Sequence, residues 1–84
     1  MNVSSVVVRV APERAADGMR HLASLPGVEI RFTDVARGRI VVTQETETAG
    51  EQEEGLRRIQ ALPGVLSADL VCHYVDEEGN GDTA

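Results

Sequence analysis

The sequence predicts an α+β domain in which two helices cover one face of a four-stranded antiparallel sheet. The tetrapeptide Leu-Pro-Gly-Val occurs twice, at 25–28 and at 62–65. Each copy follows an amphipathic stretch and precedes a strand-like stretch, so the chain reads as a duplicated β-α-β unit. With 84 residues there is room for one small domain, which we expect to span residues 1–75.

The first half opens with a β-branched run over residues 5–10, which predicts a largely buried strand. Pro12 suits the first turn of a helix, because the N–H that it lacks has no helical partner at that position. Apolar residues then recur on one helical face at Ala15, Met19, Leu22 and Ala23. The run Leu25-Pro26-Gly27 ends this helix, since Pro and Gly do not continue it.

A second strand and a tight turn are expected after this break. Val28, Ile30 and Phe32 alternate with Glu29, Arg31 and Thr33. The alternation predicts a half-buried strand whose apolar set faces the helices. Residues 34–38 then predict a hairpin turn in which Gly38 adopts a positive φ.

The second half repeats the plan. Residues 39–45 predict a strand, and Thr48 with Glu51 three residues later matches a capping box at a helix start. Leu56 and Ile59 define the inner face of that helix, which ends at the second Pro-Gly pair. In the last strand we expect the helix-facing residues to be Leu66, Ala68, Leu70, Cys72 and Tyr74, alternating with Ser67, Asp69, Val71, His73 and Val75.

The resulting element order is βαββαβ. Right-handed crossovers interleave the two halves, which gives a ferredoxin-like sandwich with strand order 4-1-3-2 and both helices on one face. The other face of the sheet stays open, and we expect function to lie there.

Parity along each strand predicts which residues occupy the open face. The third strand is apolar at both parities, and we assign Ile40 and Val42 to the core. The expected partner-binding residues are Val7, Arg9, Val41, Thr43, Glu45, Asp69, Val71 and His73. The valines among them would form an apolar strip with a charged border, a composition typical of an interaction surface. Two other interpretations stay open: a homodimer that stacks its open faces, and β-propensity without a functional role.

Composition excludes several classes of partner. The net charge of −6 and an aromatic content of 2% argue against nucleic acid and anionic membranes. The acidic residues gather in 45–54 and in 76–84. We expect the segment 76–84 to be a disordered acidic tail, either a solubilising extension or an attractor for a basic partner. No apolar run is long enough to span a membrane and no signal peptide is evident, so the cytoplasm is the expected location.

The residues that carry catalytic or metal chemistry are sparse. Cys72 is the single cysteine, and we expect it to be a small core residue. Its neighbour His73 would point to the opposite face, so the two would not share a metal ion. There is no Cys-x-x-Cys pair and no glycine-rich phosphate loop after a strand. We therefore expect a non-enzyme with no catalytic residue, no metal and no cofactor.

Four segments together resemble the NapD family: 5–8, 25–30, 38–42 and 64–74. The resemblance covers residues 4–78, and Cys72 stands where the family pattern has Tyr. It implies a ferredoxin-like cytoplasmic chaperone that binds the twin-arginine signal peptide of the catalytic subunit of the periplasmic nitrate reductase. Binding would delay export until the molybdenum cofactor and the iron–sulfur cluster are inserted, and the chaperone would carry no cofactor itself.

Two alternatives from other classes remain at this point. One is a regulatory domain of the same fold that binds a small ligand at a dimer interface. The other is a structural module of a larger complex. We expect a monomer, and light scattering would separate it from an obligate dimer.

Overall fold

The computed structural model describes residues 2–75, with side chains as far as Cys72. Its elements follow in the order β1 (Asn2–Val10), η1 (Pro12–Arg14), α1 (Ala15–Ala23), β2 (Val28–Asp34), η2 (Val35–Arg37), β3 (Arg39–Thr46), α2 (Ala49–Gln60) and β4 (Val65–Val75), where η marks a 3-10 turn. The predicted tail, 76–84, lies outside the described residues.

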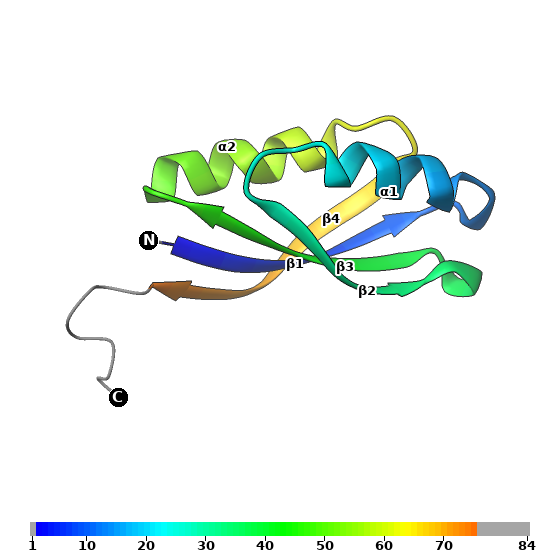
Figure 1. The fold of residues 1–84 in the computed structure, drawn as a ribbon, viewed down its shortest axis with the longest axis horizontal. Helices are drawn as coiled ribbons and strands as arrows, with labels where there is room; N and C mark the ends of the chain where they lie inside the picture. The colour runs from blue at the N-terminus through cyan, green and yellow to red at the C-terminus, as the bar shows by residue number, and fades with distance from the viewer. Residues whose placement is uncertain (1, 76–84) are drawn as a thin grey trace.

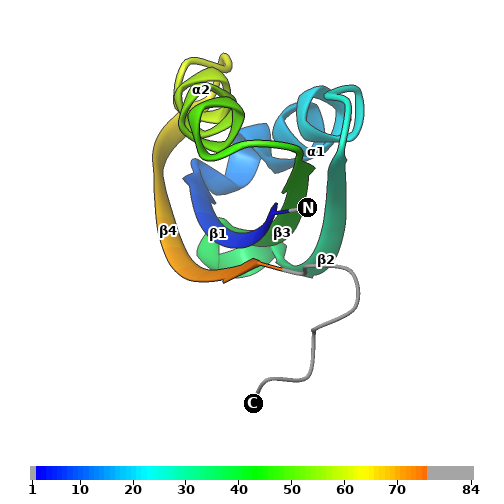
Figure 2. The same ribbon diagram turned by 90° about the vertical axis from the view of Figure 1, so that its left-hand side faces the viewer.

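The four strands form one antiparallel sheet in the order β2-β3-β1-β4. This is the predicted order read from the opposite edge, and it confirms the ferredoxin-like prediction. Both helices lie on the same side of the sheet (Figure 1). The sheet curves up on either side beneath them, so the uncovered face is its convex, outer side (Figure 2).

The core lies between the central strands and the helices. Its fully buried aliphatic side chains are Val6 and Val8 of β1, Leu22 of α1, Ile40 and Val42 of β3, and Ile59 of α2. Burial of each such side chain contributes about 1.5–3 kcal/mol relative to leaving it in water. Gly18 lets α1 lie close to β1, because a β-carbon there would stand 3.2 Å from Val10 Cγ1.

Each copy of Leu-Pro-Gly-Val forms the turn from a helix into the next strand. The amide of Val28 donates to the carbonyl of Leu25 at 3.3 Å, and that of Val65 donates to the carbonyl of Leu62 at 3.2 Å. Gly27 has φ +77° and Gly64 has φ +87°. A type II turn requires a positive φ at its third position, which glycine supplies, and commonly has proline at its second.

The start of α2 is capped much as the sequence predicts. The hydroxyl of Thr48 accepts a hydrogen bond from the amide of Glu51 at 3.1 Å. The Glu51 carboxylate accepts from the amide of Glu47 at 3.0 Å, one residue before the cap, instead of from the cap itself. Both bonds satisfy N–H groups that would otherwise lack partners at this end.

Gly55 determines how closely α2 approaches the sheet. A β-carbon at this position would collide with the side chain of Gln44, which is buried on the helix side of β3. That amide donates to the carbonyl of Gln52 at 3.3 Å. A glycine in the helix therefore makes room for a buried, hydrogen-bonded glutamine beneath α2.

The edge strand β2 departs from the predicted alternation. Its pairing with β3 skips Arg31, so Ile30 pairs with Val42 while Phe32 pairs with Val41. A bulge of this kind adds one residue and reverses the alternation beyond it. The predicted core position of Phe32 is wrong: its side chain is 55% exposed.

The other edge strand, β4, is irregular at two points. Its pairing with β1 skips Leu66 and Val71, and the side chain of Leu66 is 71% exposed. Beyond the second irregularity Cys72 pairs with Ser5, an open-face residue, and is exposed. The predicted core positions of Leu66 and Cys72 are therefore wrong. Ala68 is buried as predicted, whereas Leu70, opposite Val6, keeps 40% of its surface exposed.

Candidate functional site

Directly paired residues of antiparallel strands lie on the same face, so the ladder arranges the open face in rows. One row crosses the sheet through Phe32 of β2, Val41 of β3, Val7 of β1 and Asp69 of β4. Its first three members form the apolar row. Val7 and Val41 are half-buried, while Phe32 and Asp69 are exposed. The apolar row thus runs over three adjacent strands and stops at a carboxylate.

The next row towards the start of β1 is polar. Thr43 pairs with both Glu29 and Ser5. The bulged Arg31 reaches over this row: its Nε donates to Thr43 Oγ1 at 3.1 Å, and a terminal nitrogen lies 2.7 Å from Glu29 Oε1. Because this ion pair is largely exposed, it contributes at most about 1 kcal/mol.

A groove of about 270 Å³ opens beside this polar row. It is lined by Val3, Gly27, Val28, Glu29, Arg31, Thr43 and Glu45. Its carboxylates differ in their partners: Glu29 is paired with Arg31, whereas no ion pair among the described residues engages Glu45. The groove therefore offers one uncompensated negative charge to a ligand on the open face.

The row on the other side of the apolar row is basic. Arg9 pairs with Arg39 on one flank and with Ser67 on the other. The carboxylate nearest in register, Asp34, is instead held by Arg37 at 3.3 Å. We call Arg9 and Arg39 the basic row.

Six of the eight predicted site residues lie on the open face as expected: Val7, Arg9, Val41, Thr43, Glu45 and Asp69. Val71 is the irregular residue of β4; it is 60% exposed but has no place in the apolar row. The side chain of His73 lies outside the described residues. Sequence reasoning missed Phe32, because nothing in the alternation of residues 28–33 signals a bulge.

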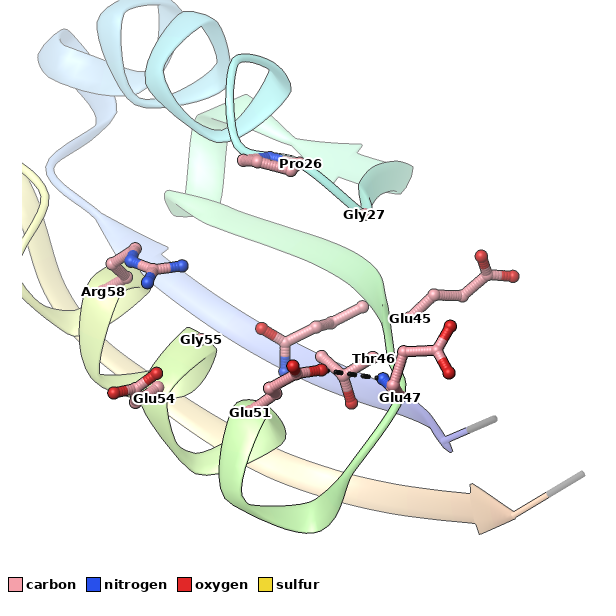
Figure 3. Close-up of a pocket in the computed structure, with 10 residues that line it drawn as sticks. Pro26, Gly27, Glu45, Thr46, Glu47, Glu51, Glu54, Gly55 and Arg58 are labelled. Atoms are coloured by element: carbon pink, nitrogen blue, oxygen red, sulfur yellow. Dashed lines mark hydrogen bonds between the residues drawn. The ribbon is translucent and has the colours of Figure 1, made fainter.

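A second cavity, of about 440 Å³, lies on the helix side between α2, the end of β3 and the Pro26-Gly27 turn (Figure 3). Four carboxylates line it, from Glu45, Glu47, Glu51 and Glu54, together with the guanidinium of Arg58. We call it the acidic cleft. It shares Gly27 and Glu45 with the open-face groove, so the two cavities meet at the end of β3. The acidic run 45–54 is visible in the sequence, but only the fold brings it opposite the first Pro-Gly turn.

Neither a membrane-spanning helix nor a cluster of metal ligands is found in the part of the chain that the structure describes. Residues 2–75 contain no helix that is long and apolar enough to cross a membrane. Among residues 2–72, whose side chains are described, no three His, Cys, Asp or Glu residues are grouped so as to hold a metal ion.

Comparisons with known proteins agree with the fold and the sequence pattern. A family model described as NapD protein matches residues 1–77. The chain is 39% identical over 75 residues to a protein of Paracoccus pantotrophus named Chaperone NapD; the match covers 89% of this chain and 65% of that relative. The solution structure of the E. coli Tat proofreading chaperone protein NapD superposes with a TM-score of 0.80 at 29% identity. That match covers 98% of this chain and 84% of the E. coli chain.

Proposed function

This chain belongs to the NapD family, and from this premise we propose that it is a chaperone that binds a twin-arginine signal peptide on its open sheet face. The cargo is the catalytic subunit of the periplasmic nitrate reductase, whose export is delayed until its cofactors are inserted. The E. coli relative is described as a Tat proofreading chaperone, in agreement with this role. The apolar row with its charged borders is the observation that carries the assignment to this face.

The chemistry of such a peptide complements the open face. An arginine pair precedes a moderately apolar segment in a twin-arginine signal, and apolar contact with Phe32, Val41 and Val7 would remove that segment from water. A guanidinium binds a carboxylate through two parallel hydrogen bonds, and Glu45 has no other cation as a partner among the described residues. One peptide thus satisfies both the apolar and the acidic features.

This role also determines the expected state of the protein. The chaperone acts in the cytoplasm, where the signal peptide is present before export. It acts as a monomer, because a dimer that stacked its open faces would cover the apolar row. It performs no reaction and needs no cofactor of its own, since binding and release of the peptide are sufficient.

Calorimetric titration with the synthetic signal peptide of the nitrate reductase tests the proposal. We expect saturable binding that weakens when the arginine pair is changed to two lysines, since lysine lacks the planar fork of donors. An unrelated apolar signal peptide serves as the control. No binding, together with a dimer by light scattering, would favour a ligand-binding regulatory domain instead.

Substitutions on the sheet test the location. Val41→Glu and Val7→Glu each introduce a charge into the apolar row, and we expect either to weaken binding at least tenfold, since about 1.4 kcal/mol corresponds to a factor of ten. Val35→Glu in η2 is the matched control, because Val35 is exposed outside the apolar row. Unchanged affinity in folded Val41→Glu would show that the peptide binds elsewhere.

A further inference from the structure

The two ends of the open face carry opposite charge. At the end where β1 begins lies Glu45, opposite Val3. At the end where β1 finishes lies the basic row, Arg9 and Arg39. Among the described residues, no ion pair engages any of these three charged side chains. The face therefore has a charge polarity along its strands, with the apolar row between the two ends.

The acidic end extends beyond the face itself. Glu45 is shared between the open-face groove and the acidic cleft, which adds the carboxylates of Glu47, Glu51 and Glu54 and one guanidinium, that of Arg58. Figure 3 shows the Glu45 and Glu47 side chains beside one another at the mouth of this cleft, across from Arg58. A cationic ligand at Glu45 thus meets a negative potential that continues around the end of β3.

The basic end favours a ligand that supplies hydrogen-bond acceptors. The Nε of Arg39 is buried without a hydrogen-bond partner. Its neighbour on the face, Arg9, is a second guanidinium, which donates but does not accept. The terminal nitrogens of the two guanidiniums favour an acceptor from a ligand, such as a backbone carbonyl or a carboxylate, whereas another arginine would add a third positive charge.

The curvature of the sheet favours a ligand that lies along the strands. The open face is convex across the strands (Figure 2), so an elongated peptide keeps most contact by following β1 and β3. From Glu45 to Arg39 is six residues of β3, or about 20 Å at the rise of a strand. A helical segment of about 13 residues covers that distance, enough for an arginine pair and the apolar segment behind it.

From these observations we infer that the signal peptide lies along the open face in the direction of β1, with its arginine pair at Glu45 and the far end of its apolar segment at Arg9 and Arg39. This inference rests on the proposed function. In the opposite direction the arginine pair would face the two unpaired arginines of the basic row, where like charges repel. The polarity of the face thus selects one of two directions that the apolar row alone would accept equally.

Paramagnetic broadening tests the direction with the intact chain. A nitroxide is attached to the signal peptide either just before its arginine pair or at the end of its apolar segment, and amide signals of the ¹⁵N-labelled protein are recorded. With the first label we expect the amides of Val3, Thr43 and Glu45 to lose intensity; with the second, those of Arg9, Arg39 and Ser67. The reversed pattern would overturn the direction and leave the proposed function intact.

Two other outcomes would reject the proposed function together with the direction. Binding without broadening at either set of amides would place the peptide away from the open face. Absence of binding would remove the signal peptide as the ligand altogether. Each result is thus distinguishable from a reversal of the peptide.

Charge substitutions provide a second readout. We expect Glu45→Gln to weaken binding of the arginine-pair peptide about fivefold, the range of one exposed charge pair, and to have no effect on a peptide with two glutamines in place of the arginines. Glu53→Gln is the matched control, because Glu53 is an exposed carboxylate of α2 already paired with Arg57. Tighter binding of the arginine-pair peptide to Arg9→Gln, with no such gain for the glutamine peptide and no loss in Glu45→Gln, would overturn the direction, because a reversed peptide places its arginine pair beside Arg9.

Discussion

The central strands of this sheet follow the alternation of inward and outward residues that the sequence predicts, whereas the edge strands depart from it. Every second residue is buried throughout β1 and, in β3, as far as Gln44, and the helix-facing positions Val6, Val8, Ile40 and Val42 have no exposed surface. In β2 and β4 the alternation breaks at Arg31, Leu66 and Val71. A central strand is held by a neighbour on each side and by the helices above, whereas an edge strand has one neighbour and accommodates an extra residue more readily.

The largest effect that this comparison predicts is a cavity under the helices. Ile40→Ala removes a buried side chain of β3 and should lower the free energy of unfolding by about 3 kcal/mol, because the surrounding core relaxes only partly. Val41→Ala, at the next position but on the open face, is the matched control and should cost less than about 1 kcal/mol. Urea denaturation followed by circular dichroism measures both. Equal losses would mean that the two faces of β3 are equally covered.

How well the sequence predicts the fold follows from this difference. The duplicated Leu-Pro-Gly-Val and the order of elements are sufficient for the topology, because short right-handed connections leave few arrangements of four strands. On β1 parity alone also places Val7, whereas on β3, which is apolar at both parities, Val41 follows from the assignment of Ile40 and Val42 to the core. There the helices can cover only one face, so the more apolar parity must lie inward.

The sequence does not predict the irregularities of the edge strands or the acidic cleft. Ile30, Arg31 and Phe32 alternate as in a regular strand, and no glycine marks the bulge that turns Phe32 outward. Bulges depend on the twist and pairing of the assembled sheet, which are tertiary properties. The cleft likewise joins the Pro26-Gly27 turn to an acidic run near residue 50, two segments that only the folded chain brings together.

The two Pro-Gly turns permit a second comparison, between equivalent positions of the repeat. Gly64→Ala should cost about 1–2 kcal/mol, which is the strain of a left-handed φ alone. The added β-carbon itself has room, because it would stand 3.6 Å from the nearest atoms of Arg14. Alanine at Gly27 also places its β-carbon 2.6 Å from the backbone oxygen of Glu45. We expect Gly27→Ala to destabilise the protein by about 1 kcal/mol more than Gly64→Ala in thermal denaturation. The opposite ranking would contradict the closer approach at the first turn.

Phe32 tests whether the bulge in β2 separates stability from binding. Truncation of a buried phenylalanine costs about 3–5 kcal/mol, but Phe32 is more exposed than buried, so Phe32→Ala should cost less than about 1 kcal/mol. The same change removes one third of the apolar row, and we expect it to weaken signal-peptide binding severalfold in calorimetry. Leu22→Ala is the contrasting control, since Leu22 is fully buried in α1 and does not reach the open face. A large loss of stability in Phe32→Ala would indicate that Phe32 is buried and that β2 alternates regularly, without the bulge.

The smallest effect on stability is expected at Cys72, where the thiol itself reports the course of β4. An exposed thiol should react with a disulfide reagent in the native protein about as fast as in urea, and Cys72→Ser should change stability by less than about 0.5 kcal/mol. Ala68→Cys in the Cys72→Ser background is the matched control, because Ala68 lies on the same strand and is only 3% exposed. That thiol should react only after unfolding. Protection of Cys72 in the native protein as well would indicate that β4 alternates regularly through Val71. The second irregularity of β4 would then be absent, and the contrast between the edge strands and the centre of the sheet would be weaker.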